Sequence, residues 1–286
     1  MKFCFYTPIA YDYKYAYPSI MSYYDIADWI VLAIDKDRIS WNNQKYDFNF
    51  HDFLKKIKSI DKDKKISIFE GDFHKFKTPI DNDTDERNLI SKYIENNLPD
   101  YDKNWYMIGI DSDEVLLNPK EFRIWLDENS YALNDEEMKM HPVNRRRHSN
   151  VHALWYSVYK SYGDKVLVTL PHEWAMIGTK IVNSYRKCRY TSPAHELRSP
   201  LKILHYSWGR SRDEVLQKIR NWSHSSQFNI DNYFRVWDNV SLNNYSKLRN
   251  FHPLNVQGAW ERLKLMELNQ FNLSKKILDE LNGITS

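Results

Sequence analysis

The sequence predicts an α/β protein with a mostly parallel central sheet flanked by helices. Two observations support this class. Short apolar segments alternate with longer amphipathic ones over the first 117 residues. The apolar segments are also almost free of polar residues, as expected of parallel strands that are buried on both faces. Strands are expected at residues 2–7, 29–35, 65–71 and 105–110.

Helical spacing of apolar residues fills the gaps between these strands, at residues 18–28, 50–60 and 83–98. The pattern weakens after residue 130, and residues 128–150 are expected to form a polar loop. Beyond it we expect strands at 153–160 and 165–170 and helices at 213–224 and 258–281. No segment has the composition of a linker. We therefore expect one domain, 1–225, with a helical C-terminal extension, 226–286, packed on it.

Composition limits the class of protein. The 286 residues have a net charge of +3 and are 42% hydrophobic, which excludes disorder and does not by itself indicate nucleic-acid binding. Two cysteines, Cys4 and Cys188, favour a reducing compartment. The N-terminus lacks the features of a signal peptide, and no apolar run approaches the roughly 20 residues of a membrane helix. We expect a cytoplasmic protein that is at most peripheral at the inner membrane face.

Three carboxylates follow the fourth expected strand, in the stretch WYMIGIDSDEVLL. Asp111, Asp113 and Glu114 lie so close in sequence that their charges should repel one another unless a cation is present. Ligands of parallel sheets bind beyond the carboxyl ends of the strands. Carboxylate oxygens suit Mg²⁺ or Mn²⁺, and such ions commonly also bind substrate phosphates. The alternative is an acidic turn without a ligand.

This stretch resembles the Asp-x-Asp-Glu signature of GT-A (Rossmann-like) glycosyltransferases close to family 2. The segment PAHELRSPLKILHYSWG, with the pairs His195-Glu196 and His205-Tyr206, is similar to bacterial members related to lipopolysaccharide-core enzymes. The resemblance covers residues 1–225, although the family's Gln-x-x-Arg-Trp motif and the short motif after the first strand are absent. It implies an inverting, metal-dependent transfer from a UDP- or GDP-linked sugar to a glycan or glycolipid.

The resemblance also implies roles for individual residues. Asp111 would face the ribose or sugar of the donor, and Asp113 would bind Mn²⁺ or Mg²⁺ with His205 and Asp111 as further ligands. Without the resemblance, a lone histidine is more simply a hydrogen-bonded core residue. The remaining expected contacts to the nucleotide sugar are Thr7, Pro8, Tyr11, Asp35, Arg87 and Ser112.

Two glutamates are candidates for the general base that deprotonates the acceptor hydroxyl. Glu196 is favoured by its spacing to His205, which matches the family pattern. Glu173 follows an expected strand and precedes Trp174, which is also a suitable position. Acceptor or phosphate contacts are expected from the one dense basic run and from a nearby aromatic: Arg145, Arg146, Arg147 and Trp208. The basic run is equally compatible with a solvated loop.

Other functions remain open at this point. A glycosyltransferase of the phage type that acts on modified DNA would use the same fold, with the basic run and the many Tyr and Trp side chains contacting phosphates and bases. A non-catalytic module that binds nucleotide sugars is a further alternative. A nucleotidyltransferase is disfavoured because the chain has seven glycines and no glycine-rich phosphate loop. The donor, the acceptor and the oligomeric state are not indicated by the sequence.

Overall fold

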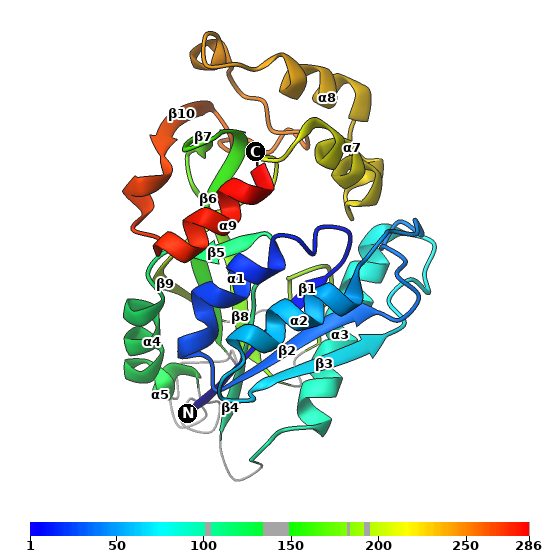
Figure 1. Cartoon of the computed structure of the whole chain (residues 1–286), viewed down its shortest axis with the longest axis vertical. Coiled ribbons are helices and arrows are strands. Elements are labelled where there is room, and N and C mark those ends of the chain that lie inside the picture. Colours follow the sequence, from blue (N-terminus) through cyan, green and yellow to red (C-terminus); the bar gives the residue numbers. More distant parts are fainter. Residues whose placement is uncertain (101–103, 134–148, 182–183, 192–194, 286) are drawn as a thin grey trace.

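The computed structural model describes residues 1–100, 104–133, 149–181, 184–191 and 195–285 (Figure 1). No helix within these ranges is both long and apolar enough to cross a membrane. The helices are α1 (Ala16–Tyr23), α2 (Phe50–Ile60), α3 (Pro79–Asn96), α4 (Pro119–Glu128), α5 (Ser130–Leu133), α7 (Arg212–Asn221), α8 (Ile230–Asn239) and α9 (Lys275–Thr285). The strands are β1 (Lys2–Ile9), β2 (Trp29–Asp35), β3 (Ile66–Gly71), β4 (Trp105–Gly109), β5 (Glu114–Leu116), β6 (Ser149–Tyr162), β7 (Lys165–Leu170), β8 (Glu173–Lys180), β9 (His195–His205) and β10 (Arg262–Glu267).

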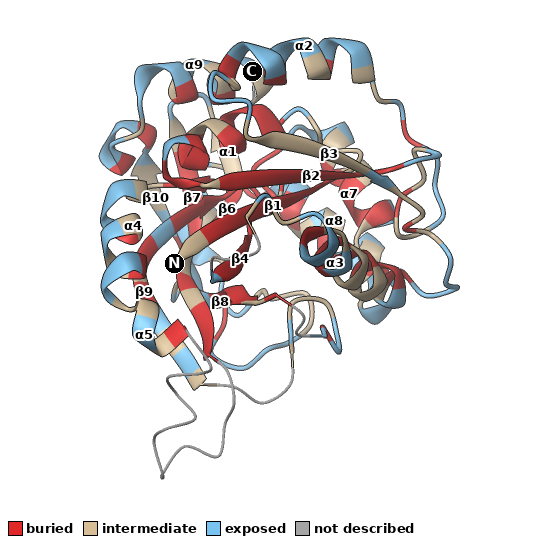
Figure 2. Ribbon diagram, turned by 90° about the horizontal axis from the view of Figure 1, so that it is seen from below, coloured by how far each residue is buried: buried red, intermediate tan, exposed pale blue. Residues whose placement is uncertain are grey.

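The first four strands form a parallel sheet in the order β3-β2-β1-β4. Because side chains alternate along a strand, each strand contributes to two cores. In β1, Phe3 and Phe5 pack with residues of α1 and α2, whereas Cys4 and Tyr6 pack with residues of α3. Helices α1 and α2 accordingly cover one face and α3 the other (Figure 2). The α/β class with a central sheet flanked by helices is confirmed.

The second half of the sheet is built mostly from antiparallel pairs. Strand β8 pairs with β4, and β6, β7 and β10 follow outward in antiparallel order. Strand β9 runs parallel to β6 and also pairs with the short β5, which directly follows the turn after β4. This pairing brings the carboxyl end of β9 next to the carboxyl end of β4. The predicted strands at 153–160 and 165–170 lie in β6 and β7.

The predicted helix over residues 258–281 is wrong in its first half. Residues Arg262–Glu267 form β10, a short 3₁₀ turn follows at Leu268–Phe271, and the α-helix begins at Lys275. Apolar and charged residues alternate over the first four positions of RLKLME, so Leu263 and Leu265 point to one face of a strand while Arg262 and Lys264 point to the other. Pairing with β7 buries Leu263 in an aromatic core beneath α7 and α8. The C-terminal region thus adds a strand to the central sheet.

Candidate functional site

A cavity of about 450 Å³ opens at the carboxyl ends of β1 and β4. Asp111, Ser112 and Asp113, from the turn after β4, lie in its wall. Residues 252–260 of the C-terminal region contribute a further part of the wall. The lining also includes many aromatic side chains: Tyr11, Trp41, Trp155, Trp174, Tyr190, Trp208, Trp222 and Trp260. Flat rings with one polar edge suit sugars and bases, so this lining is typical of a small-molecule site.

The turn after β4 holds its carboxylates in fixed positions. The Glu114 carboxylate accepts from the Asp111 backbone N–H at 3.1 Å, and the Glu114 N–H donates to the Asp111 carbonyl at 3.0 Å. The Ser112 hydroxyl donates to Asp12 at 2.8 Å. Glu114 is thereby buried behind the turn, while Asp111 and Asp113 reach the cavity.

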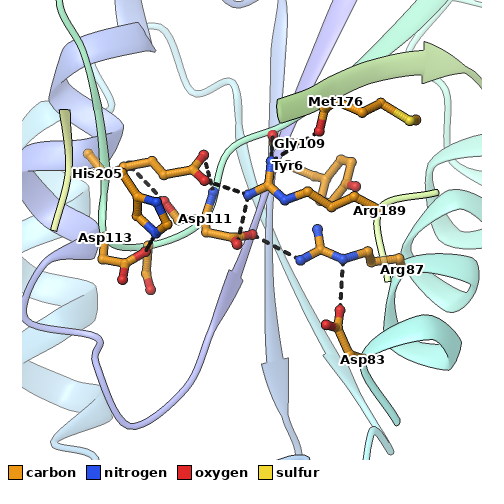
Figure 3. Close-up of polar contacts among 12 residues, drawn as sticks. Tyr6, Asp83, Arg87, Gly109, Asp111, Asp113, Met176, Arg189 and His205 are labelled. Atoms are coloured by element: carbon orange, nitrogen blue, oxygen red, sulfur yellow. Dashed lines mark hydrogen bonds and ion pairs between the residues drawn. The ribbon is translucent and has the colours of Figure 1, made fainter. Parts of the chain in front are cut away.

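The positive charge beside Asp111 comes from the chain's own arginines (Figure 3). Arg87 of α3 lies 3.1 Å from one Asp111 oxygen, and Arg189 lies 2.7 Å from the other. Arg189 also lies 2.6 Å from Glu114, and Arg87 lies 2.8 Å from Asp83. Both arginines line the cavity. The carboxylates are therefore paired in the absence of any ligand.

Asp113 has a separate set of cations. Its Oδ2 atom pairs with Arg210, which also contacts Asp12 at 3.0 Å, and with Lys218 of α7 at 3.2 Å. Its Oδ1 atom faces His205 Nε2 at 3.5 Å. Burial alone would raise the pKa of Asp113, but Lys218, His205 and Arg210 hold it well below its usual range. Asp113 is thus a carboxylate at every pH at which the protein would work.

Burial and ion pairing shift the pKa values of Asp111 and Glu114 in opposite directions. Burial would raise the pKa of Asp111 as well, but Arg189 and Arg87 hold it below its usual range. Glu114 differs because burial dominates, raising its pKa from 4.5 to about 7 despite Arg189. The turn consequently presents two ionised carboxylates, Asp111 and Asp113, to the cavity. Behind them lies one buried acid, Glu114, whose pKa is raised toward neutral pH.

Two side chains of this cluster could contribute ligands to a divalent cation. Asp113 and His205 both line the cavity, with Oδ1 and Nε2 3.5 Å apart, and the described contacts of Arg210 and Lys218 go to Oδ2. A carboxylate oxygen and an imidazole nitrogen are suitable ligands for Mn²⁺, and the carboxylate also suits Mg²⁺. Two protein ligands are few, so the rest of the coordination shell would come from water or from phosphate oxygens of a substrate.

The expected donor contacts divide into two groups. Pro8, Tyr11, Arg87 and Ser112 line the cavity, and so does Trp208, which was expected to contact the acceptor. Thr7 and Asp35 are not among the described residues that line it. The Thr7 hydroxyl instead hydrogen-bonds to the Tyr23 hydroxyl within the core at 2.7 Å.

Asp35 serves the turn that follows β2. Its oxygens accept from the backbone N–H groups of Asp37, Ile39 and Phe73 at 2.9–3.0 Å. His74 adds a contact at 2.7 Å, and Asp35, His74 and Asp72 form a group that could hold a metal ion by distance alone. Because its oxygens already accept three backbone hydrogen bonds, we assign Asp35 to stabilising the loop that brings Ser40 and Trp41 to the cavity.

The structure separates the two candidate bases. Glu196 and His205 lie nine positions apart on the same strand, β9, which puts them roughly 30 Å from each other along the chain. Glu196 is exposed and is not among the described residues that line the cavity. Glu173 is the first residue of β8 and lies opposite Trp155 of the neighbouring strand β6. It lines the cavity together with His205. The sequence spacing that favoured Glu196 therefore does not correspond to proximity in space.

Arg145, Arg146 and Arg147 lie outside the described residues. Sequence reasoning also overlooked the cations that contact the carboxylates: Arg189, Arg210 and Lys218. Lys218 lies on an amphipathic helix, where a lysine usually faces solvent, yet it is 6% exposed. A local signal existed only for Arg210, which follows the HYSWG stretch that carried the resemblance.

Neither a family model nor a curated protein sequence matches this chain. Among solved structures, a crystal structure of S. aureus TarS, residues 1–349, is similar over part of the chain, with 15% sequence identity and a TM-score of 0.31. The match covers 57% of this chain and 38% of the TarS chain. Similarity at this level assigns neither a family nor an activity.

We expect the substitution Asp113→Ala to destabilise the protein, contrary to what repulsion among the carboxylates alone would predict. Arg210 and Lys218 are both buried, and removing their shared partner takes away the ion pair that the described residues give Lys218. Breaking a buried ion pair from one side typically costs about 3–5 kcal/mol. Urea denaturation measures the loss, and the double variant Asp113→Ala/Lys218→Met should recover part of it. Unchanged or increased stability of Asp113→Ala would show that the pairing contributes nothing.

A second prediction concerns Glu86, a buried cavity residue that accepts from the Trp41 indole. Burial raises the pKa of Glu86 from 4.5 to about 8. Its protonated form therefore favours folding below pH 4.5, and this contribution is lost as the pH rises through about 8. Glu86→Gln cannot ionise, so we expect it to exceed the wild type in unfolding free energy by about 1–3 kcal/mol at pH 9 and by less at pH 5. A difference that does not change with pH would contradict this assignment.

Proposed function

We propose that the protein is a glycosyltransferase that moves a sugar from a nucleotide-sugar donor to a glycan or glycolipid acceptor. The observation that carries the proposal is the arrangement of the cavity. An acidic pair after β4 is surrounded by arginine and lysine side chains within an aromatic wall at the carboxyl ends of parallel strands. A nucleotide sugar needs all three features, because it combines a base, a diphosphate and a sugar.

The donor diphosphate has cationic partners in the cavity wall. Arg87, Arg189 and Lys218 all line it, whereas Arg210 is not among the described residues that do so. Guanidinium groups bind phosphate oxygens through paired N–H donors. Arg189 also lies over the Trp155 ring at 5.3 Å, which restricts where its guanidinium can point. These side chains would orient the leaving group of a UDP- or GDP-linked sugar.

A divalent cation, Mn²⁺ or Mg²⁺, would be held by Asp113 and His205. When bound, it would supply Lewis-acid stabilisation of the departing diphosphate. The chain's own contribution is to keep Asp113 ionised and His205 in place. The His205 ring lies against Trp155, with ring centroids 4.5 Å apart, and the strand pairing between β9 and β5 sets His205 opposite Glu114.

Glu173 is the proposed general base. The acceptor hydroxyl would lose its proton to the Glu173 carboxylate while its oxygen bonds to the anomeric carbon of the sugar. The bond from that carbon to the diphosphate breaks at the same time, and the nucleoside diphosphate leaves. A single displacement of this kind inverts the anomeric centre, in agreement with the outcome that the sequence resemblance implies.

Two other functions have less support. A DNA-modifying enzyme would need a basic face, but the charges described around the cavity are mixed in sign. A non-catalytic module needs no base beside the donor site, yet Glu173 lies in the same cavity as Asp113 and His205. Salt-sensitive binding of duplex DNA would favour the first alternative, and donor binding without any turnover would favour the second.

Nucleotide binding tests the proposal directly. We expect UDP, GDP or one of their sugar conjugates to raise the melting temperature, and Mn²⁺ to enlarge the shift. His205→Ala should weaken the Mn²⁺ effect about 10-fold or more in a metal titration, because one of two protein ligands is lost. His224→Ala is the matched control, since His224 also lines the cavity but hydrogen-bonds to Gln227. If no nucleotide or nucleotide sugar shifts the wild-type protein, the proposal fails.

The choice of base is tested by two matched substitutions. Glu173→Gln keeps the size of the side chain but cannot accept a proton, so we expect kcat to fall about 10²- to 10⁴-fold with little change in donor affinity. Glu196→Gln should retain kcat within about twofold, because Glu196 is remote from His205 along β9. The assay measures the nucleoside diphosphate that is liberated from UDP-glucose, UDP-N-acetylglucosamine or GDP-mannose. The reverse pattern would return the role of base to Glu196.

A further inference from the structure

Trp260 has an unusual backbone conformation for its residue type. Its φ angle is +51°, in the left-handed region where a bulky side chain is a rare exception. This conformation is unfavourable for a bulky residue, so the surrounding structure must enforce it. Two backbone hydrogen bonds do so, from Phe251 N–H to the Trp260 carbonyl at 3.3 Å and from Asn250 N–H to the Glu261 carbonyl at 3.1 Å.

Aromatic packing fixes the indole as well as the backbone. The Trp260 ring has Tyr159, Phe251 and His252 as neighbours, with centroid distances of 6.2, 5.8 and 4.6 Å. Trp260 is 5% exposed, yet it also forms part of the cavity wall. Its conformation therefore presents one edge of a fixed ring to the site.

That edge carries the indole N–H, which donates to Glu173 Oε2 at 2.6 Å. An indole is a donor only, so this contact binds the carboxylate and does not compete with it for a proton. Among the described residues, no hydrogen bond reaches the other oxygen, Oε1. The pair thus joins the C-terminal region to the first residue of β8.

We propose that Trp260 is a positioning residue that holds the Glu173 carboxylate so that Oε1 faces the acceptor hydroxyl. The inference rests on the proposed function, because it assigns Trp260 a role in the work of Glu173 as base. A carboxylate at the start of a strand can otherwise rotate among several rotamers. Fixing one oxygen leaves the second in a single orientation, and misplacing a reacting group by about 1 Å can cost about 10²-fold in rate.

The test compares two tryptophans. Trp260→Phe keeps an aromatic ring and removes the N–H, and we expect kcat for cleavage of UDP-glucose, UDP-N-acetylglucosamine or GDP-mannose to fall about 10- to 100-fold with donor KM unchanged. Trp237→Phe is the matched control. Trp237 is equally buried, belongs to the same aromatic core, and donates its N–H to the backbone carbonyls of Tyr159 and Trp208. It should lose stability and keep kcat.

A double-variant cycle separates positioning from general damage. In the Glu173→Gln background, Trp260→Phe should cause no further loss of kcat, because the group that it positions is already inactive. Its effect on stability should persist in that background. If the two losses of kcat multiply, or if Trp260→Phe and Trp237→Phe lower kcat alike, the positioning role is wrong.

Donor binding keeps this inference distinct from the proposed function. If the wild type binds none of the three nucleotide sugars, the proposed function itself fails. If it binds and cleaves one of them while Trp260→Phe retains full kcat, only the role of Trp260 is refuted. Should Trp260→Phe not fold, the ¹⁵N–¹H resonance of the Trp260 indole gives a second measurement. Replacing Glu173 by Gln should shift that resonance upfield, and an unmoved resonance would refute the contact.

Discussion

The ionised carboxylates of the turn after β4 need cations beside them, and this constraint shapes the centre of the molecule. Asp111 and Asp113 belong to a single turn, but their partners come from distant parts of the chain: Arg87, Arg189, Arg210 and Lys218. An isolated buried charge carries a desolvation penalty of several kcal/mol, so the buried members, Arg87, Asp113, Arg210 and Lys218, depend on their partners. The turn, α3, the segment containing Arg189 and α7 are therefore held together by charge as well as by apolar packing.

The same pairing affects what the cavity can accept. Because the carboxylates are already neutralised, a bare metal ion would enter against the repulsion of Lys218 and Arg210. A bare diphosphate would face the charges of Asp111 and Asp113. In the proposed reaction the metal ion and the diphosphate bind together. A dianionic diphosphate with a divalent cation adds no net charge to the cavity. A preference for the combined ligand follows from electrostatics without any rearrangement of the backbone.

Local patterns in the sequence were sufficient to predict the parallel half of the sheet and the acidic turn. Strands such as β2 are continuous apolar runs, and Asp111 follows such a run directly, so both could be recognised from neighbouring residues. Contacts between residues far apart in the sequence could not be recognised in this way. Lys218 looks like a solvent-facing residue of an amphipathic helix, and its burial depends on the position of Asp113, 105 residues away.

Two differences between the sequence-based expectations and the structure have the same origin. The spacing between Glu196 and His205 would suit two ends of a loop, but an extended strand separates them, and the sequence pattern does not distinguish these cases. In β10, Leu263 and Leu265 alternate with charged residues over too few positions to outweigh the helical pattern around them. Pairing with β7 decides the outcome, and that pairing joins residues about 100 positions apart.

The placement of residues 252–260 in the cavity wall has a consequence for synthesis of the protein. Chains emerge from the ribosome N-terminus first, and the parallel half of the sheet can begin to form early. The charged cluster requires Lys218, and the last part of the wall requires Trp260. A nascent chain thus acquires β1 to β9, then its buried charges, then the last part of the cavity wall, and finally β10. Products terminated before residue 252 would lack this part of the wall even where most of the fold is present.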